Sequence, residues 1–329
     1  MLRYAIVGCG SAARYHLFHL QQNPLVKIVA LCDPSAEIAA PFRSLAVKRY
    51  IDFQEMFDSE ELDAVSLVTP HYLHYDQIMA CAKRGIHVLC EKPLAISYSD
   101  GEKVVAACER AEVKLAVMLP RRLFNNTEAL KKALATQALG KVTASSYILH
   151  AHKGPEYYQG WRGKKEFAGG GVVMCQALHD LDRLVYCFGP ATVISSKLNT
   201  TRLFIDVEDT AEVVLEFSGG LRCSFHADTI STESWTGKTI ILGTQGNVVL
   251  NSEYTEEWSV PGIPQPEPND DNYDPEVKPR YYGPCHGIII NDFIESITQN
   301  REPLISGKST LPTLQVLFEI YGKAKSSLS

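Results

Sequence analysis

The stretch LRYAIVGCGSAARYHLFHLQQNPLVKIVALCD, residues 2–33, decides the fold of the first part of this chain. An apolar run over 2–7 leads into a turn of small residues and then into a helix-compatible segment over 12–22. A second apolar run, 27–32, ends in Asp33. This order of strand, glycine turn, helix, strand and acid is typical of a unit that lays a dinucleotide across the edge of a parallel sheet.

The small residues of the turn each suit one requirement of a bound pyrophosphate. Gly8 permits a tight turn, and Gly10 lets the backbone approach the phosphates where a Cβ atom would collide. Ala13 is small enough for the helix to pack against the first strand. Ser11 and Ala12 open the helix, whose N-terminal N–H groups favour an anion. We therefore predict cofactor binding at this turn, with an ordinary βα turn as the alternative.

Asp33 favours NAD as the cofactor. It lies 23 positions after Gly10, close to the roughly 20 residues that separate such a turn from the acid that binds the adenosine ribose. A carboxylate there would repel the 2′-phosphate of NADP. Arg43 or Lys48 could still reach such a phosphate, so NADP stays open at this point. The alternative role for Asp33 is a helix cap before Pro34.

Composition narrows the class of protein further. A chain of 329 residues predicts about two domains, and its net charge of −6 without a basic run argues against a nucleic-acid surface. No apolar stretch approaches the roughly 20 residues of a membrane span, and the chain starts directly in a strand, so we expect no cleavable signal. Nine cysteines show no CxxC pair and no zinc spacing with histidine, which predicts a reduced, cytoplasmic protein without a structural metal.

Strands and helices alternate through residues 1–120, which we predict to be a dinucleotide-binding domain. Strands separated by helices of 10 to 15 residues imply a doubly wound parallel sheet, the Rossmann arrangement. After Asp33 we expect helices over 35–46, 71–84 and 100–110, and strands over 62–68, 86–89 and 113–119. Pro120 closes this region.

Residues 121–329 change pattern, and we predict an α+β domain with a large, open, mainly antiparallel sheet. Apolar residues alternate over 211–217 and 221–227 around a Ser-Gly-Gly turn, which is typical of a hairpin with one buried face. A second hairpin is expected from 239–242 and 248–250. Such a sheet has a face to cover, so we expect a homodimer or homotetramer formed through it. We expect a long loop or lid over 261–285, and helices near 126–137, 173–187, 286–299 and 310–327.

Glu91-Lys92-Pro93 follows the strand that ends near Leu89. The carboxyl ends of parallel strands open onto the ligand crevice of a doubly wound sheet. A lysine at that end can hydrogen-bond a reacting hydroxyl and help its proton leave. The alternative is a surface lysine paired with Glu91.

Gly169-Gly170-Gly171 precedes a helix that carries Cys175, Gln176 and His179. Residues 175 and 179 are four apart and share a helix face. Glycines let the backbone come close to a ligand or to the first domain, and imidazole is suited to moving a proton near neutral pH. The alternative is a histidine bonded to a neighbour such as Asp182.

These segments together resemble the Gfo/Idh/MocA family, which includes glucose–fructose oxidoreductase, inositol dehydrogenase and a rhizopine catabolism protein. The resemblance covers nearly the whole chain and rests on GCGSAA (8–13) with Asp33, TPHYLH (69–74), HVLCEKP (87–93), Arg121-Arg122, Trp161-Arg162, GGGVVMCQALHDLD (169–182) and VEDTA (207–211). It implies that Lys92 and His179 do the acid–base work. It implies a cofactor cleft lined by Thr69, Pro70, His71, His74, Glu91 and Lys92. Substrate contacts are implied for Arg122, Trp161, Arg162, Gln176, His179 and His286.

One position departs from the family pattern. The family usually has Asp, sometimes Asn, four residues before the histidine, where this chain has Cys175. A thiol is mostly neutral and bonds weakly, so it cannot stabilise an imidazolium as a carboxylate would. Gln176 or a substrate group would then take over part of that role, and Cys175 joins Lys92 and His179 among the candidate catalytic residues. Ala177 replaces the usual glycine, a milder change.

The resemblance implies hydride transfer between NAD(P) and a ring carbinol of a sugar, nucleotide sugar or cyclitol. A diphosphate substrate would need cations, for which Arg121, Arg122, Arg162, Lys164 and Lys165 are candidates. Two alternatives remain open here. One is a glycoside hydrolase that uses NAD in a transient oxidation, and the other is a non-catalytic sensor that binds NAD.

Overall fold

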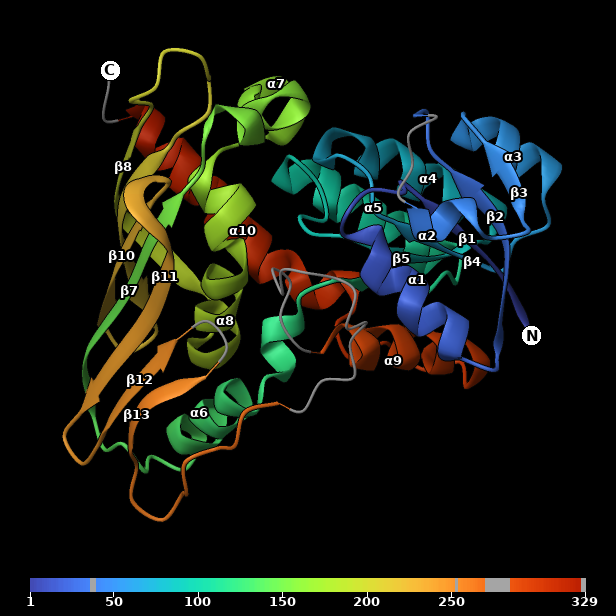
Figure 1. The fold of residues 1–329 in the computed structure, drawn as a ribbon. Helices are drawn as coiled ribbons and strands as arrows, with labels where there is room; N and C mark the ends of the chain where they lie inside the picture. The colour runs from blue at the N-terminus through green and yellow to red at the C-terminus, as the bar shows by residue number, and fades with distance from the viewer. Residues whose placement is uncertain (36–39, 252–253, 270–284, 327–329) are drawn as a thin grey trace. The chain divides into compact units, whose positions relative to one another are not determined.

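The computed structural model describes residues 1–35, 40–251, 254–269 and 285–326. The chain divides into two compact units (Figure 1). The first contains residues 1–120 and, from the distant C-terminal part of the chain, 285–311. The second contains 121–269 and 312–326. The division falls after Pro120, and 285–311 belongs to the first unit.

Within the described residues, the first unit is built on a six-stranded parallel sheet with the order β3-β2-β1-β4-β5-β6. The strands are β1 (Leu2–Val7), β2 (Val26–Cys32), β3 (Lys48–Tyr50), β4 (Ala64–Leu67), β5 (His87–Cys90) and β6 (Leu115–Val117). The strand order reverses between β1 and β4, which is the switch point where doubly wound sheets bind ligands. The predicted Rossmann sheet is therefore confirmed.

Five helices of the first unit lie in the connections between its described strands, and a sixth comes from the C-terminal part of the chain. They are α1 (Ala13–Gln22), α2 (Ala40–Arg43), α3 (Phe53–Ser59), α4 (His74–Arg84), α5 (Tyr98–Arg110) and, from the C-terminal part, α9 (His286–Thr298). Of the expected helix over 35–46, residues 36–39 lie outside the described part. The sequence missed β3 and α3, because β3 is short and exposed and α3 buries few of its residues.

Helix α9 packs against α1, far from it in sequence. The rings of Tyr15 and His286 lie 5.3 Å apart, and Tyr4 meets Phe293 edge to face at 6.5 Å. A Cβ atom on Gly287 would come within 2.6 Å of the His19 ring, so this glycine allows the two helices to approach. This contact explains why 285–311 folds with the first unit.

The second unit is built, within the described residues, on a seven-stranded mixed sheet with the order β13-β12-β11-β7-β10-β9-β8. Its strands are β7 (Val142–His152), β8 (Ala191–Asn199), β9 (Thr210–Phe217), β10 (Leu221–Asp228), β11 (Ile230–Gly243), β12 (Asn247–Asn251) and β13 (Thr255–Ser259). Both predicted hairpins, β9–β10 and β11–β12, are confirmed. Only the β7–β10 pair is parallel among the described pairs of this sheet.

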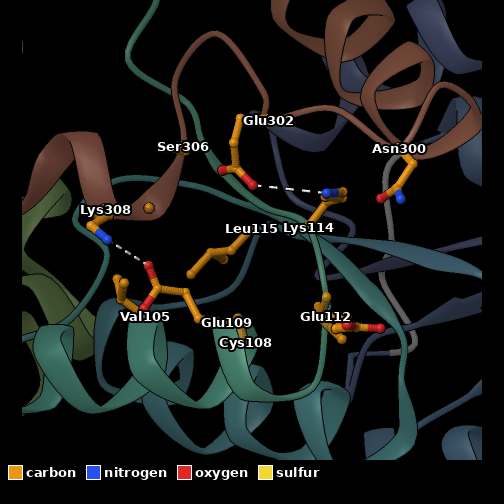
Figure 2. Close-up of a pocket in the computed structure, with 12 residues that line it drawn as sticks. Val105, Cys108, Glu109, Glu112, Lys114, Leu115, Asn300, Glu302, Ser306 and Lys308 are labelled. Atoms are coloured by element: carbon orange, nitrogen blue, oxygen red, sulfur yellow. Dashed lines mark hydrogen bonds and ion pairs between the residues drawn. The ribbon is translucent and has the colours of Figure 1, made fainter.

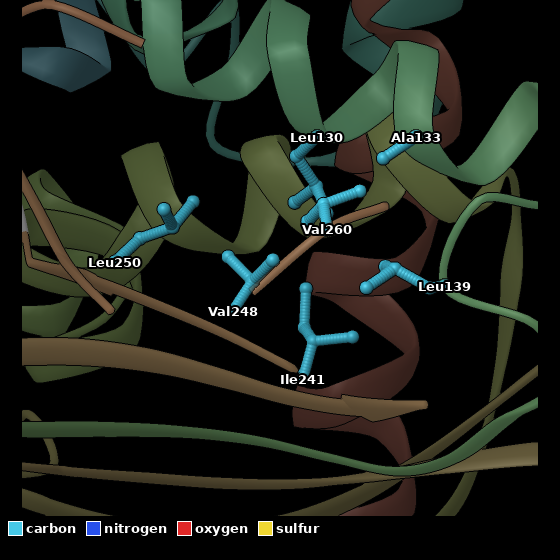
Figure 3. Packing of buried hydrophobic residues seen from close by; sticks show 7 residues of the cluster. All are labelled: Leu130, Ala133, Leu139, Ile241, Val248, Leu250 and Val260. Atoms are coloured by element: carbon cyan, nitrogen blue, oxygen red, sulfur yellow. The ribbon is translucent and has the colours of Figure 1, made fainter. Parts of the chain in front are cut away.

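Figure 1 shows the long helices of the second unit on one face of this sheet. The helical segments are α6 (Asn125–Ala135), α7 (Lys165–Ala168), the π-helical turn η5 (Val173–Ala177), α8 (Leu178–Phe188) and α10 (Gly307–Ser326). Three short 3-10 turns are η2 (Pro120–Leu123), η3 (Pro155–Tyr158) and η4 (Gly160–Gly163). A buried cluster fills one part of the space between helices and sheet (Figure 3): Leu130, Ala133, Leu139, Ile241, Val248, Leu250 and Val260.

The structure also bears on the expected loop over 261–285, on membrane spans and on the cysteines. Residues 261–269 contain no helix or strand, and 270–284, the rest of the expected loop, lie outside the described residues. In the described part of the chain, no helix is both long and apolar enough to cross a membrane. All nine cysteines lie in that part, and each is a free thiol.

Candidate dinucleotide and substrate site

The glycine turn after β1 separates two kinds of glycine. Gly8 has a φ of +87°, and a Cβ atom on it would collide with the carbonyl oxygen of Val68. Around Gly10, in contrast, no described atom lies within 4 Å of the position that a Cβ atom would occupy. The protein itself therefore needs a glycine at position 8, whereas the open space at Gly10 suits a ligand that approaches the backbone.

The start of α1 is also built to receive an anion. Ala12 stands at the N-cap without a side-chain hydrogen bond, and the first turn, all of it described, carries no acidic residue. The partial positive charge of the helix N-terminus is therefore not neutralised locally. Ser11, Ala12 and Ala13 thus lie where the sequence predicted pyrophosphate contacts, and the residues present fit a dinucleotide.

Asp33 is held beside this turn. Its Oδ2 accepts the Cys9 N–H at 2.7 Å, and its Oδ1 accepts the Ser35 N–H at 2.8 Å. The second bond is a local turn contact, so the helix cap of the alternative interpretation stays a prediction, and the first bond ties the carboxylate to the glycine turn. Lys48, one of the cations that could have favoured NADP, donates to Glu60 at 2.6 Å.

His74 joins the loop after β4 to the Glu91-Lys92-Pro93 turn after β5. Its ring is fully buried, with Nδ1 2.7 Å from the Pro93 carbonyl oxygen and Nε2 3.0 Å from that of Thr69. Thr69 Oγ1 donates to Gln77 at 2.6 Å. His71 is buried beside His74, with ring centroids 6.1 Å apart. His74 therefore fixes the backbone of the predicted cofactor loops, and its buried ring is a support for them.

Glu91 is oriented by a chain of buried polar groups that sequence reasoning missed. His16, fully buried in α1, places Nε2 3.3 Å from Glu91 Oε1 and Nδ1 2.9 Å from Ser66 Oγ. Ser66 also bonds the Tyr4 hydroxyl at 2.9 Å. Burial raises the pKa of Glu91, but the hydrogen bond of His16 and the charges of His16, His286 and Lys92 together hold that pKa below its usual value. The signal available in the sequence was His16, a histidine on the buried face of α1.

Lys92 follows at the carboxyl end of β5 and is partly exposed. Its backbone N–H donates to Glu91 Oε2 at 3.2 Å. The carboxylate of Glu91 is thus engaged with His16 and with the backbone of the turn. This arrangement fixes the segment from which the Lys92 side chain extends.

The three glycines before η5 make room for their own unit. A Cβ atom on Gly170 would collide with the Tyr321 hydroxyl, and one on Gly171 would collide with the backbone of Glu208. Gly169 adopts a φ of +80°. At Gly170 and Gly171 the close neighbours are residues of the second unit, and the expected approach to a ligand or to the first domain stays a prediction.

Glu208, in the VEDTA segment, caps the turn that leads to His179. Its Oε2 accepts the Gly171 N–H at 2.7 Å, and its Oε1 accepts the Val173 N–H at 3.2 Å and the Tyr321 hydroxyl at 2.8 Å. The carboxyl is completely buried, and burial raises its pKa. The sequence placed VEDTA among the motifs of the family resemblance, but only the tertiary contacts reveal that Glu208 caps this turn.

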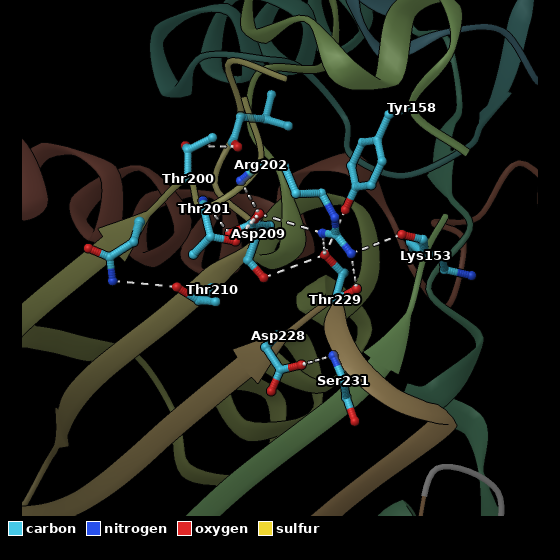
Figure 4. Close-up of polar contacts among 12 residues, drawn as sticks. Lys153, Tyr158, Thr200, Thr201, Arg202, Asp209, Thr210, Asp228, Thr229 and Ser231 are labelled. Atoms are coloured by element: carbon cyan, nitrogen blue, oxygen red, sulfur yellow. Dashed lines mark hydrogen bonds and ion pairs between the residues drawn. The ribbon is translucent and has the colours of Figure 1, made fainter. Parts of the chain in front are cut away.

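The neighbouring Asp209 fixes the other side of the same segment (Figure 4). Its carboxylate, which is fully buried, accepts the N–H and hydroxyl of Thr201 at 3.0 and 2.8 Å. It lies 3.5 Å from the Arg202 guanidinium, which donates to the Thr229 and Lys153 carbonyl oxygens. Asp209 therefore holds the segment of Thr201 and Arg202 in place.

The helix that carries His179 begins with a π-helical turn and is not a single α-helix over 173–187, as we expected. The π turn η5 contains Cys175 and Gln176, and α8 begins just before His179. Turns of this type are frequent at functional sites. The four-residue spacing that relates side chains on an α-helix does not apply unchanged across η5. His179 is partly exposed.

Arg122 and Asp182 form a buried ion pair. Arg122 donates through Nε and Nη2 to the two carboxylate oxygens of Asp182 at 2.8 and 2.6 Å, and Thr313 donates to the same carboxylate at 2.7 Å. Arg122 is only 5% exposed. Arg122 and Thr313 thus engage Asp182, which gives Arg122 a structural role, and its implied contact with a substrate stays a prediction. His286 is likewise buried in the first unit, against α1.

Three of the implied substrate residues meet in one cluster of the second unit. Gln176 Nε2 donates to the Tyr157 hydroxyl at 2.6 Å. The Arg162 guanidinium lies 4.6 Å from the Trp161 ring centroid and 5.3 Å from that of Tyr157. Cys175 packs against the same small apolar cluster as Tyr157 and Trp161.

Lys153 extends this cluster, and neither it nor Tyr157 was singled out from the sequence. Its Nζ lies 5.0 Å from the Tyr157 ring centroid. Burial lowers the pKa of Lys153, and the positive charge of Arg162 lowers it further. A platform of aromatic rings with two cations suits a polar, ring-shaped or anionic ligand.

A separate hollow of the first unit lies at the end of α5 (Figure 2). Its charges are paired, with Lys308 3.0 Å from Glu109 and Lys114 3.8 Å from Glu302. None of the sequence-predicted site residues lines it. We therefore assign no role in the chemistry to this hollow.

A Rossmann sheet with a glycine turn that fits a dinucleotide is the arrangement of a nucleotide-dependent oxidoreductase. Two family models agree with it. The model described as "Oxidoreductase family, NAD-binding Rossmann fold" matches residues 2–119, and the one described as "GFO/IDH/MocA C-terminal domain" matches residues 127–249. The chain belongs to the Gfo/Idh/MocA family of oxidoreductases.

Individual relatives match most of the chain, and a solved structure shares its fold. It is 28% identical over 261 residues to 1,5-anhydro-D-fructose reductase from Ensifer adhaerens, which is 78% of either chain. It is 28% identical to D-apiose dehydrogenase from Paraburkholderia graminis over 77% of this chain and 68% of that protein. The WlbA dehydrogenase from Bordetella pertussis, solved with NADH and UDP-GlcNAcA, is 27% identical with a TM-score of 0.87 over 99% of this chain and 97% of its own.

Replacing Glu208 with alanine is expected to lower the free energy of unfolding by on the order of 3 kcal/mol, because two backbone N–H groups and the Tyr321 hydroxyl lose a buried acceptor. Glu208→Gln keeps one acceptor oxygen and should lose less. Urea denaturation measures both. A Glu208→Ala variant as stable as the wild type would contradict the capping role.

The wild type and Glu208→Gln together also test the protonation state of the Glu208 carboxyl. Because its pKa is raised in the folded chain, its contribution to stability is fully present below the unfolded pKa of about 4.3 and declines as pH rises through the folded pKa. The stability advantage of the wild type over Glu208→Gln should therefore shrink from acidic to neutral pH. An advantage that grows with pH would show that the folded-state pKa is lowered instead.

Proposed function

We propose that this chain transfers a hydride between NAD and a ring carbinol or ketone of a sugar, nucleotide sugar or cyclitol. The open space at Gly10, beside an uncapped helix N-terminus, is the observation that carries the assignment of the cofactor. Gly8, Gly10, Ser11, Ala12 and Ala13 would hold the pyrophosphate. Asp33 would bind the ribose, and the segments Thr69–His74 and Glu91–Pro93 would line the nicotinamide end.

The bound nicotinamide supplies the hydride chemistry, and the chain supplies binding and proton transfer. Lys92 Nζ hydrogen-bonds the substrate oxygen and so stabilises the charge that develops there during the reaction. The His179 imidazole takes the hydroxyl proton during oxidation and returns it during reduction. His16 and Glu91 position the turn that carries Lys92, and Glu208 positions the helix that carries His179.

The substrate is proposed to lie against the cluster of Trp161, Arg162, Tyr157 and Gln176. Aromatic rings stack on the apolar face of a sugar ring, while the Gln176 amide and the Arg162 guanidinium reach polar groups. Three similarities support a carbohydrate: the names 1,5-anhydro-D-fructose reductase and D-apiose dehydrogenase, and the UDP-GlcNAcA bound to WlbA. Lys153 and Arg162 favour a substrate with a negative group over a neutral one.

The direct test is the absorbance of the reduced nicotinamide, with purified protein, NAD or NADP, and a panel of cyclitols, free sugars and UDP-sugars. Turnover with NAD that requires Lys92 supports the proposal. Product formed without net reduction of NAD would replace it with a redox-neutral reaction of the same site. Tight NAD binding with no turnover on any ring carbinol would instead favour a sensor.

Replacing Cys175 with aspartate tests the departure from the family pattern. If the site works as the family geometry implies, Cys175→Asp should keep or raise kcat, because a carboxylate stabilises an imidazolium better than a thiol does. Cys175→Ser is the matched control of similar size. Complete loss of activity in both variants would show that the thiol has a role of its own.

We further propose a homodimer or homotetramer formed through the sheet of the second unit. Ile148, Val214 and Ile240 lie on the sheet face opposite the buried residues of their strands. Sedimentation velocity would measure the assembly.

Nine free thiols are the support for a cytoplasmic location.

A further inference from the structure

Two histidines and an aspartate gather on the sheet of the second unit, at β7 and β10. These strands run parallel, and their register places Asp228 opposite His150. His226 precedes Asp228 by two positions on β10, so both side chains leave the strand on the same face. The intervening Ala227 is fully buried on the other face, as are Leu149 and Ala151 beside His150. The sheet therefore brings the three polar side chains together, although 76 residues separate His150 from His226.

The donor atoms lie at distances that suit a metal ion. His150 Nδ1 is 2.6 Å and His226 Nε2 is 3.2 Å from the same oxygen, Asp228 Oδ2. All three ligand atoms lie within 4.8 Å of one another. Around a tetrahedral zinc ion with bonds of roughly 2.0 to 2.1 Å, two ligand atoms are about 3.3 Å apart. The two printed pairs, at 2.6 and 3.2 Å, lie at or below that value, so small side-chain rotations would open the cluster enough to admit an ion.

Exposure and charge favour a cation that keeps one position open. The side chains of His150 and His226 are 40% and 37% exposed, whereas that of Asp228 is 9% exposed. Asp228 Oδ1 accepts the Ser231 N–H at 3.0 Å (Figure 4), which fixes the orientation of the carboxylate, as the second layer of a metal site does. Two imidazoles and one carboxylate are ligands that suit zinc and its neighbours in the first transition row.

We propose that His150, His226 and Asp228 bind one divalent transition-metal ion of the zinc class. His150 Nδ1, His226 Nε2 and a carboxylate oxygen of Asp228 are the protein ligands, and a water molecule completes the coordination from the exposed side. The site is distinct from the proposed oxidoreductase residues, but it shares the sheet face of Ile148, through which we propose that copies of the chain associate. The competing explanation is that His150 and His226 only hydrogen-bond the Asp228 carboxylate and that the cluster binds no metal.

Equilibrium dialysis of the tag-free, full-length protein against Zn²⁺, followed by metal analysis, tests the proposal. The expected result is one ion per chain, expressed per chain so that the assembly state does not enter. His150→Ala and His226→Ala should each weaken binding by about 100-fold or more, since each removes a direct ligand. Both side chains are partly exposed, so these variants are expected to fold, and circular dichroism would check them.

Histidine 152 provides the matched control. His152 follows His150 by two positions on β7 and is exposed, but its Nδ1 contacts the Ser231 carbonyl oxygen at 2.9 Å and it is outside the cluster. His152→Ala should keep the ion. The visible absorption of bound Co²⁺ would report tetrahedral coordination, and Asp228→Asn should change that spectrum.

Two results would overturn the assignment. One is the absence of stoichiometric Zn²⁺ and Co²⁺ binding to the folded protein, which would leave hydrogen bonding as the account of the cluster. The other is binding that persists in a His150→Ala/His226→Ala double variant, which would place the ion elsewhere. The nicotinamide assay on the same preparations shows separately whether the proposed oxidoreductase function holds.

Discussion

A valine at position 10 is expected to abolish dinucleotide binding and to leave the fold intact. Apart from the residues next to it in the chain, no described atom lies within 4 Å of the position that a Cβ atom on Gly10 would take, so we expect the added side chain to fill space left for the ligand. We expect affinity for NAD to fall by roughly 100-fold or more, which is about 2.8 kcal/mol at 1.4 kcal/mol for each factor of ten. Isothermal titration calorimetry measures the affinity, and thermal unfolding measures the stability.

Gly8→Ala is the contrasting variant in the same turn. Gly8 has a φ of +87° and backs onto the Val68 carbonyl, so even a methyl group strains the chain. We expect its free energy of unfolding to fall by more than about 1 kcal/mol. If Gly10→Val bound NAD with unchanged affinity, or if it unfolded as readily as Gly8→Ala, the assignment of this turn to the cofactor would fail.

Lys92→Met should lower kcat by about 10²- to 10⁴-fold, the usual contribution of a positioned proton-transfer group, while the affinity for NAD changes little. Methionine keeps the length and the apolar stem of lysine and removes its charge and donors. The measurement compares kcat from the nicotinamide assay with the dissociation constant of NAD from calorimetry. A variant with wild-type turnover would remove Lys92 from the mechanism.

Lys103→Met provides the control on α5 of the same unit. Lys103 is exposed and pairs with Asp100 at 3.0 Å on the helix surface, a kind of pair that contributes little to stability. Its replacement should leave both turnover and NAD affinity unchanged. A similar loss in both variants would indicate a general effect of removing positive charge.

Local signals explain what the sequence predicted well. The first βαβ unit needs only apolar runs, small residues and one acid within 33 positions, and the structure reproduces β1, α1 and β2 within about one residue. The β9–β10 hairpin was visible because Ala211, Val213 and Leu215 alternate strictly with other residues. In β7, in contrast, the buried positions are Ser145, Tyr147, Leu149 and Ala151, which give too weak a hydrophobic contrast to reveal a strand.

Several residues that the sequence singled out for the site also have a structural task in the fold. The glycines at 170 and 171 accommodate Tyr321 and Glu208, and Arg122 neutralises Asp182. His286 follows a return of the chain to the first unit, which no pattern near residue 286 indicates. Each of these roles depends on a partner more than 35 positions away, beyond the reach of periodicity and motif spacing.

Neighbouring residues were enough to predict the family, the Rossmann sheet and the cofactor turn, because each of these depends on a short segment that must satisfy one local geometry. Only the folded chain shows which polar groups support that turn, how Glu208 caps the helix of His179, and which histidines share Asp228. Those arrangements follow from strand register and from buried hydrogen-bond partners far apart in the chain. Burial makes unsatisfied polar groups costly, so the fold selects partners that sequence proximity does not reveal.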